Sequence, residues 1–222
     1  MKQNSKKICY NELTCGRDTL ERVIRMKKMN RVIIGLLLIQ FSAMLIACEG
    51  QTSRPSSELK TPFTDAITLD LDYEGLSFVE DGLGAVQLHR CVDGDTARFT
   101  EDGGLTHYSV RFLGIDTPEV GRNAEPWGAA ASRYVCDRLN AAETIVLEWD
   151  ASTTRLGTYG RYLAFVWVDG RLLNLELIEL AFTESMGIRT RFGEEMTLAW
   201  FATRETGRRI YGERDPDYPY TD

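Results

Sequence analysis

The sequence predicts a mixed α+β domain, and three observations lead to this fold class. Five segments between residues 84 and 171 have the apolar character and the turn boundaries of β-strands. A helical segment separates the third strand from the fourth, and two more helical segments follow the fifth. The composition, 43% hydrophobic and 27% charged over 222 residues, is typical of a folded chain rather than a disordered one.

The first three strands are predicted between residues 84 and 115. Residues 84–95, GAVQLHRCVDGD, alternate apolar and polar side chains, as a half-buried strand does. Residues 95–115 contain two strand-like runs separated by Asp102-Gly103-Gly104, a sequence typical of a hairpin turn. We therefore expect one strand followed by a β-hairpin.

The later part of the chain is predicted to contain three helices and two strands. Pro126 suits the first turn of a helix, where a missing N–H is tolerated. Asn174 is a suitable N-cap for the second helix, and the third is acidic at its start and basic at its end, which suits the helix dipole. The predicted elements are a helix over 125–142, strands over 143–150 and 159–171, and helices over 174–182 and 194–212.

The order β-β-β-α-β-β-α-α favours a small five-stranded β-barrel of the OB type, with about three α-helices on its flank. Such a barrel has no free sheet edge, because the sheet closes on itself. The architecture does not by itself imply a function.

The first 48 residues have the features of an export signal. A basic stretch that begins at Met26 precedes an apolar run over residues 32–47, which is shorter than the ~20 residues that span a bilayer. Leu45-Ile46-Ala47-Cys48 resembles the lipobox of bacterial lipoproteins, which implies cleavage before Cys48 and a lipid on that cysteine. A plain signal peptide, with secretion, and an uncut membrane anchor are the alternatives.

The predicted organisation has three parts. Residues 1–48 form an N-terminal extension and signal peptide, with translation starting at Met26 or Met29. Residues 49–65 read as a flexible tether, and residues 66–222 as one folded, monomeric domain at the cell envelope.

Two cysteines and both histidines lie within the predicted domain. Cys91 and Cys136 would form a disulfide in an exported protein or remain two buried thiols, and their spacing does not decide between these. His89 and His107 are isolated in the sequence, and no Cys-x-x-Cys motif occurs. The sequence therefore predicts no zinc site.

Charge is distributed unevenly along the chain. Residues 1–48 carry nine basic and three acidic side chains, whereas residues 49–222 carry 17 basic and 30 acidic ones, a net charge of −13. Such an acidic body argues against a protein that coats nucleic acid non-specifically. A small basic cleft is still compatible with it, because local fields decide binding at a site.

Carboxylates follow or interrupt the apolar strands at several points. Asp93 and Asp95 lie in VDGDT (92–96), and Asp116 and Glu119 end RFLGIDTPE (111–119). If the strands are neighbours, these groups converge and repel one another unless a cation lies among them. Oxygen ligands without His or Cys indicate a hard cation such as Ca²⁺ or Mg²⁺. Taken alone, Asp-Gly-Asp is more often a simple turn.

Two arginines accompany these acids. Arg111 lies inside an apolar strand, where its charge needs a partner or a cleft, and Arg161 follows Tyr159-Gly160 at the start of a strand. The ordinary explanation for Arg111 is a structural ion pair with an aspartate, and the ordinary explanation for Arg161 is a solvated position at the edge of the sheet. Two guanidinium groups that face an acid-bound cation instead form a phosphate site. Strand alternation places Arg111 and Asp116 on opposite faces, so they meet only if the chain bends, either at Gly114 or at the Asp-Thr-Pro turn of residues 116–118.

The set VDGDT, VRFLGIDTPE and YGRYLAFVWVDG resembles the staphylococcal nuclease (thermonuclease) family over about residues 83–187. The resemblance implies an OB-fold nuclease that uses Ca²⁺ to hydrolyse phosphodiester bonds in DNA or RNA. It also implies site residues, which are Ca²⁺ ligands at Asp95, Asp116 and the Thr117 carbonyl, a general base at Glu119, phosphate contacts from Arg111, Arg161 and Tyr159, and a supporting role for Asp93.

The sequence departs from the family in the loop after Glu119, which is short, and after the second predicted helix, where tyrosines are absent. Arg189 and Arg191 are candidates to replace a substrate contact there. The alternative function is a catalytically silent OB module that binds nucleic acid or protein at the cell envelope.

Overall fold

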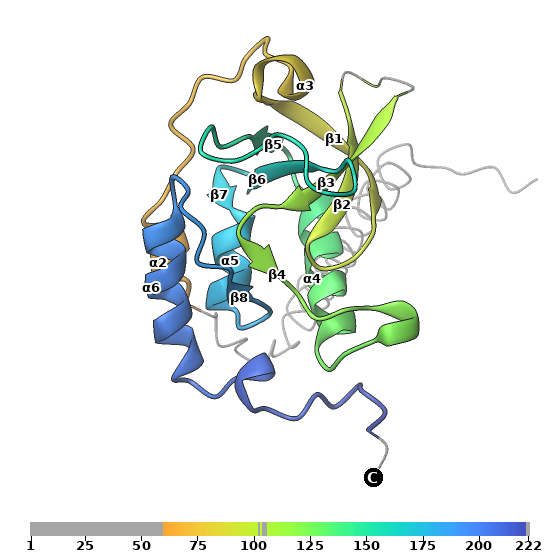
Figure 1. The fold of residues 1–222 in the computed structure, drawn as a ribbon, viewed down its shortest axis with the longest axis vertical. Coiled ribbons are helices and arrows are strands. Elements are labelled where there is room, and N and C mark those ends of the chain that lie inside the picture. The colour runs from red at the N-terminus through yellow and green to blue at the C-terminus, as the bar shows by residue number, and fades with distance from the viewer. Residues whose placement is uncertain (1–59, 102, 104–105, 221–222) are drawn as a thin grey trace, which may run out of the picture. The chain divides into compact units, whose positions relative to one another are not determined.

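The computed structural model describes residues 60–101, 103 and 106–220, and Figure 1 shows their fold. The expected signal segment with Cys48, and residues 49–59 of the expected tether, lie outside the described residues. Within the described part, no helix is long and apolar enough to cross a membrane. The strands are β1 (Leu83–Cys91), β2 (Thr96–Thr100), β3 (His107–Phe112), β4 (Ile115–Asp116), β5 (Ile145–Glu148), β6 (Tyr162–Val168), β7 (Arg171–Leu172) and β8 (Glu184–Ser185). The helices are α2 (Pro62–Asp65), α3 (Phe78–Asp81), α4 (Gly128–Ala141), α5 (Leu173–Glu179) and α6 (Gly193–Arg204), with 3₁₀ turns at Gly121–Asn123 and Arg209–Tyr211.

Five strands form a sheet that closes into a ring. Antiparallel pairing gives the order β3-β2-β1-β5-β6, and β6 then pairs in parallel with β3. The short strand β7 extends β6 at one side. The predicted α+β class and the five main strands are confirmed, and the ring is the closure expected of an OB fold.

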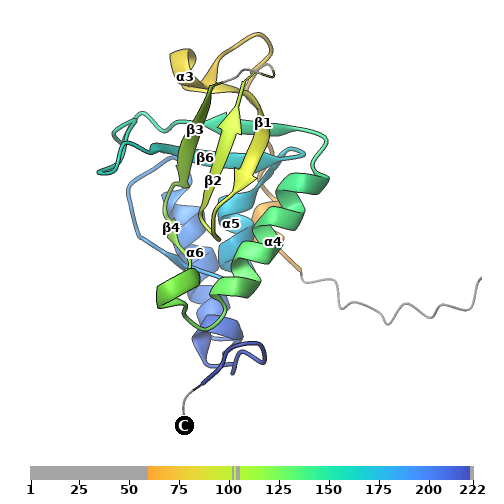
Figure 2. The same cartoon turned by 90° about the vertical axis from the view of Figure 1, so that its right-hand side faces the viewer.

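The core lies inside this ring and under the helices. Alternate residues of β2 and β3 pack in the core, namely Ala97, Phe99, Val110 and Phe112. Arg98 and Arg111 between them are half-buried, and Thr96 and Thr100 at the ends of β2 are also buried. Every residue of α5 is buried, because the helix packs between the sheet and α6. Helix α4 packs against β1 (Figure 2).

Two details of the helix predictions were wrong. Helix α4 begins at Gly128, so Pro126 lies before it, and Trp127 at the N-cap has a positive φ of 70°. A Cβ on Gly128 would come within 2.8 Å of the Pro118 carbonyl oxygen, so close packing of the preceding loop fixes this helix start. Asn174 does not cap α5 but lies inside it, where its buried side chain accepts from Val166 N at 2.8 Å and donates to Leu113 O at 2.9 Å.

The ends of the domain also differ from the prediction. Helix α6 ends at Arg204 rather than near residue 212, and the chain continues as turns. Residues 61–65, assigned to the flexible tether, include α2, which is attached to α5. The buried Glu179 carboxylate accepts from Phe63 N at 2.9 Å and from Thr64 N at 2.8 Å. This acceptor for two helix N-terminal amides explains why the segment folds.

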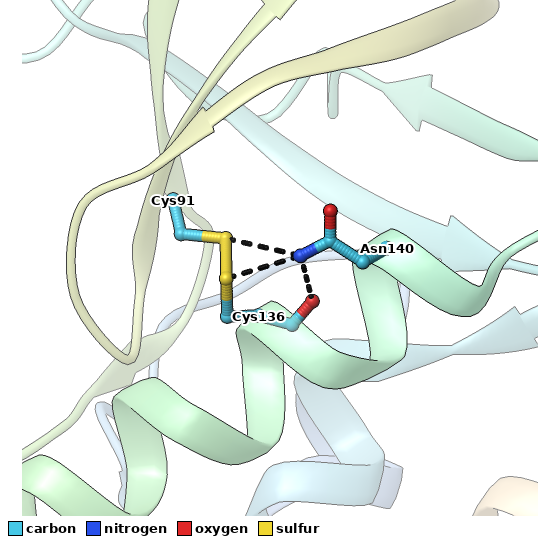
Figure 3. Close-up of a disulfide and its surroundings, with 3 residues drawn as sticks. All are labelled: Cys91, Cys136 and Asn140. Carbon is cyan, nitrogen blue, oxygen red and sulfur yellow. Dashed lines mark hydrogen bonds between the residues drawn. A yellow bond between two sulfur atoms is a disulfide. The ribbon is translucent and has the colours of Figure 1, made fainter.

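Cys91 and Cys136 form a disulfide between the end of β1 and α4 (Figure 3). Their Cα atoms are 5.6 Å apart, and Asn140 donates to the Cys136 carbonyl at 2.8 Å. Of the two alternatives that the sequence left open, the structure therefore contains the bonded one. The two histidines are not isolated, since the rings of His89 and His107 stack with centroids 4.2 Å apart.

Candidate active site

Arg111 joins two of the predicted acids. It lies on β3 opposite Thr96 of β2, and its guanidinium forms ion pairs with both Asp95 and Asp116. The chain turns at Gly114, where φ is +80°, and this turn brings Asp116 back toward the strand that it follows. Arg111 also donates to the Ile115 carbonyl at 3.2 Å, which holds the turn in place. The bend required by strand alternation is therefore present.

Asp95 is the buried centre of the cluster, with a side chain only 2% exposed. Its Oδ1 accepts from Thr96 Oγ1 at 3.0 Å and pairs with Arg111, while its Oδ2 accepts from Thr117 N at 2.9 Å and Thr117 Oγ1 at 3.1 Å. Burial raises the pKa of Asp95, although Arg111 and the Thr117 amide act in the opposite direction. The site thus holds a carboxylate whose negative charge is incompletely compensated.

Arg161 is connected to the same cluster through a hydroxyl. Its NH1 group donates to Thr96 Oγ1 at 3.2 Å, and Thr96 in turn donates to Asp95. Tyr159 is 84% exposed, and its ring lies 5.8 Å from the Arg161 guanidinium carbon. The two predicted arginines therefore approach Asp95 from β3 and from the start of β6, with Tyr159 at the outer edge.

The β1–β2 loop is folded tightly against the cluster. Asp93 Oδ1 accepts from Asp95 N at 3.1 Å, which shapes the turn. A Cβ on Gly94 would come within 2.6 Å of Thr117 Oγ1, so only glycine fits there without a shift. Asp93 thus acts on the site by shaping the loop that carries Asp95, as expected for a supporting residue.

Asp116 is held by backbone contacts while its side chain stays open. Its N–H donates to Thr183 Oγ1 at 2.9 Å, the Thr183 hydroxyl lies 2.7 Å from the Asp116 carbonyl, and β4 pairs with β8. The Asp116 side chain is 65% exposed. Neither Thr96, although it ends the motif VDGDT, nor Thr183 was predicted as a site residue, because a single threonine is compatible with many ordinary positions.

Glu119 lies three residues beyond Asp116 with an exposed side chain. Its backbone N–H donates to Glu125 Oε2 at 3.0 Å, a contact that the sequence did not predict. Among the contacts of the described residues, none links the Glu119 carboxylate to Arg111 or Arg161. The structure therefore brings Asp93, Asp95, Asp116, Thr117, Arg111 and Arg161 into one cluster and leaves the Glu119 carboxylate in solvent beside it.

An open cavity of about 370 Å³ lies beside Asp116 and Thr117, and Glu184 and Met186 of the β8 segment also line it. The donors beside it are carboxylate, carbonyl and hydroxyl oxygens, which suit a hard cation. In the part of the chain that the structure describes, no three His, Cys, Asp or Glu side chains form a metal-binding group. A cation here would rely on two carboxylates, a backbone carbonyl and water, which Ca²⁺ accepts.

The two arginines proposed as replacement substrate contacts differ from each other. Arg191 forms ion pairs with Glu148 and Asp70, both at 2.8 Å. It is therefore part of the packing around β5. Arg189 is exposed, and its backbone carbonyl accepts a hydrogen bond from Ser152 Oγ at 2.8 Å. Among the contacts of the described residues, none involves the Arg189 guanidinium.

Comparisons with known proteins agree with this site. Residues 109–199 match the family of staphylococcal nuclease homologues. The chain is 32% identical over 169 residues to the SPbeta prophage-derived endonuclease YokF of Bacillus subtilis, covering 68% of this chain and 55% of that protein. It is 28% identical over 165 residues to endonuclease YncB of the same organism, covering 68% of this chain and 76% of YncB.

A third relative is the thermonuclease of Staphylococcus intermedius, with 35% identity over 91 residues, 40% of this chain and 51% of that enzyme. The chain thus spans about half the length of two of these three relatives. The family match includes Arg111, Asp116, Glu119 and Arg161 but begins after Asp95, which the fold brings to the same place. The closed five-strand ring, the cluster around Arg111 and these matches together support the staphylococcal nuclease family for this chain.

Proposed function

We propose that this protein is a nuclease that hydrolyses phosphodiester bonds in DNA, RNA or both. The observation that carries this proposal is the arrangement around Asp95, where Arg111 and Arg161 converge on a buried carboxylate next to the open Asp116. Guanidinium groups bind the oxygens of a phosphate in a fixed geometry. The relatives named as endonucleases and thermonuclease support the same reaction.

We propose Ca²⁺ as the cofactor. Asp95, Asp116 and the Thr117 carbonyl would hold it, and their oxygen-only chemistry supports this choice over a softer metal. When bound, the ion would supply Lewis-acid polarisation of a phosphoryl oxygen.

The protein side chains have separate tasks in this proposal. Arg111 and Arg161 orient the phosphate and stabilise the negative charge that develops during attack. The exposed Glu119 carboxylate accepts a proton from the attacking water, which requires the substrate to bring water within hydrogen-bond distance of it. Tyr159 lies beside the phosphate through its position next to Arg161.

We further propose that the protein is exported as a monomer and anchored to the bacterial cell envelope by a lipid on Cys48. The lipobox-like sequence supports the anchor, and the Cys91–Cys136 disulfide supports an oxidising compartment. Metabolic labelling with a palmitate analogue should mark the wild-type chain and not the Cys48→Ala variant. Equal labelling of both would exclude this anchor.

The direct test of the activity is cleavage of single-stranded DNA by residues 49–222, first with Ca²⁺ and then with excess chelator. We expect cleavage that requires Ca²⁺ and that falls by at least about a hundredfold in Glu119→Gln and Arg161→Ala. Arg204→Ala, on the exposed surface of α6, removes the same charge and serves as the control. A folded sample that binds DNA without cleaving it would instead favour a silent binding module.

A further inference from the structure

The segment that follows α6 forms a groove of about 530 Å³ together with the loop that leads into α4. Pockets of about 300–1,000 Å³ are typical of sites for small ligands. The groove shares Pro118, Glu125 and Ile210 with the smaller cavity that contains Asp116 and Thr117. A ligand in the groove would therefore be adjacent to the proposed cleavage site.

The wall of the groove is held by specific contacts. Trp127 donates from its backbone N to the buried Asp215 carboxylate at 2.6 Å and from Nε1 to the Glu213 carbonyl at 3.0 Å. Its φ of 70° is unusual for a bulky residue, and such backbone strain persists only where surrounding contacts enforce it. Tyr218 adds a third link by donating to the Ala124 carbonyl at 3.0 Å. The groove is thus formed before any ligand binds.

The lining of the groove suits a flat, neutral ring better than a free phosphate. Trp127 and Tyr220 contribute aromatic rings, and the Arg214 guanidinium lies 4.5 Å from the centre of the Tyr220 ring. The lining contains two acids, Glu125 and Glu213, and two arginines, Arg209 and Arg214, so its formal charges cancel. Aromatic side chains stack on nucleobases of any sequence, and carboxylates accept hydrogen bonds from base amino groups.

We propose that this groove binds one unpaired nucleobase of the substrate strand, in the nucleotide next to the cleaved phosphate. The proposal rests on the nuclease function proposed above and specifies its substrate as single-stranded nucleic acid. A base within a duplex is stacked and paired, so it would have to leave the helix to reach the groove, at a cost of a few kcal/mol.

The kinetic test compares two substrates with the full chain. One is a single-stranded octanucleotide, and the other is the diester methyl nitrophenyl phosphate, which has one phosphodiester and no nucleobase. Tyr220→Ala should raise the KM for the octanucleotide about tenfold relative to the KM for the ester, because stacking contributes about 1–3 kcal/mol per base. Tyr220→Phe retains the ring and should keep most of the affinity, and Arg204→Ala is the control for folding and charge.

A binding test separates this proposal from the proposed activity. An octanucleotide that carries 5-iodouracil should photo-crosslink to Trp127 or Tyr220, as identified by peptide mass spectrometry, whether or not the protein cleaves DNA. Crosslinks at these residues without cleavage would support base binding in the groove and contradict the proposed nuclease activity. Cleavage with equal KM ratios in wild type and Tyr220→Ala, and with crosslinks elsewhere, would overturn the groove alone.

Discussion

Arg111 competes for the same carboxylates that are proposed to bind metal. An ionised carboxylate offers about four lone-pair positions, and at Asp95 four contacts are already made, by Thr96, by Arg111 and twice by Thr117. Thr96 and Thr117 contact Asp95 through short side chains and a backbone amide, so these contacts move only if the backbone moves. Arg111 has a long side chain and can rotate away from Asp95. Metal binding is therefore expected to displace Arg111 from Asp95 and to free its guanidinium for a phosphate.

This competition predicts a paired effect of Arg111→Met on stability. Without Ca²⁺ the variant should lose about 3 kcal/mol of unfolding free energy, because a buried carboxylate loses its charged partner. With Ca²⁺ the increase in Tm should be larger than in wild type, since the cation no longer competes with a guanidinium. Calorimetric titration should show tighter Ca²⁺ binding as well, although cleavage is lost. Arg161→Ala, which does not contact the carboxylates directly, should keep the wild-type increase in Tm, and an equal increase in Arg111→Met would contradict the competition.

At the residue scale, the sequence predicted the charged groups of the site but not the two threonines, Thr96 and Thr183, whose hydroxyls contact them. Asp95, Asp116 and Arg111 were recognisable because charge at the end of an apolar strand needs an explanation. Thr96 and Thr183 connect these groups through hydroxyls, and a hydroxyl is compatible with many ordinary positions. The side chain of Asn174 was assigned to a helix cap for its residue type, but it bridges Leu113 and Val166 in the core.

At the scale of elements, the strands were predicted more reliably than the helix ends. Alternation and the sequence Asp-Gly-Gly at residues 102–104 predicted β1, β2 and β3, since a strand with one buried face shows a period of two. Helix α6 stops at Arg204 although residues 205–212 continue the helical composition. A hydrogen bond from Thr206 N to the Thr203 carbonyl and a positive φ at Gly207 mark the change of direction, and these depend on packing of the following segment.

The disulfide provides a prediction about the link between β1 and α4. It spans 45 positions of the chain, so the loop-entropy relation assigns it a stabilisation of about 4 kcal/mol. The double variant Cys91→Ser/Cys136→Ser should therefore unfold at a lower denaturant concentration, with an equal or larger dependence on denaturant, because its unfolded chain is no longer cross-linked. The single variant Asn140→Ala controls for local packing at the same place. Equal midpoints for the double variant and the wild type would show that the bond adds no stability.

Asp150 links the end of β5 to the loop before α6 and should make stability depend on pH. Burial acts to raise its pKa, but hydrogen bonds from the Arg191 and Ser152 backbone amides outweigh burial and lower it. A lowered pKa contributes stability above the unfolded value of about 3.9, and this contribution disappears as the pH falls through the folded value. The unfolding free energy of Asp150→Asn should thus lie about 2 kcal/mol below wild type between pH 5 and 8, with the gap closing below about pH 4. The exposed Asp137→Asn is the matched control, and a gap that widens in acid would refute the sign.

For the whole domain, the order of the elements predicted the closed ring, whereas the C-terminal groove could not be predicted. Five strands with one helix after the third leave few compact arrangements, and closure removes the free edges. The groove depends on the contacts of Trp127 to Glu213 and Asp215, more than 80 positions away, which no local pattern encodes. The net negative charge of residues 49–222 follows directly from the sequence, and it limits the number of basic side chains that can contact the substrate's phosphates.

This charge balance predicts a weak salt dependence of binding. Arg111, Arg161 and Arg214 lie at the proposed substrate path, whereas the guanidinium of Arg209, which also lines the groove, donates to the Leu180 carbonyl. About three phosphates should therefore be contacted. For single strands the slope of log K against log salt is about −0.7 per contact, which gives a slope of about −2. Fluorescence anisotropy of a labelled octanucleotide with the cleavage-deficient Glu119→Gln variant in Ca²⁺, between about 50 and 300 mM salt, would measure this slope with Arg111 released from Asp95. Arg161→Ala should reduce the slope by about 0.7, while Arg204→Ala should leave it unchanged. A slope steeper than about −4 would require a basic surface beyond these three arginines, and it would contradict the proposed substrate path through the groove.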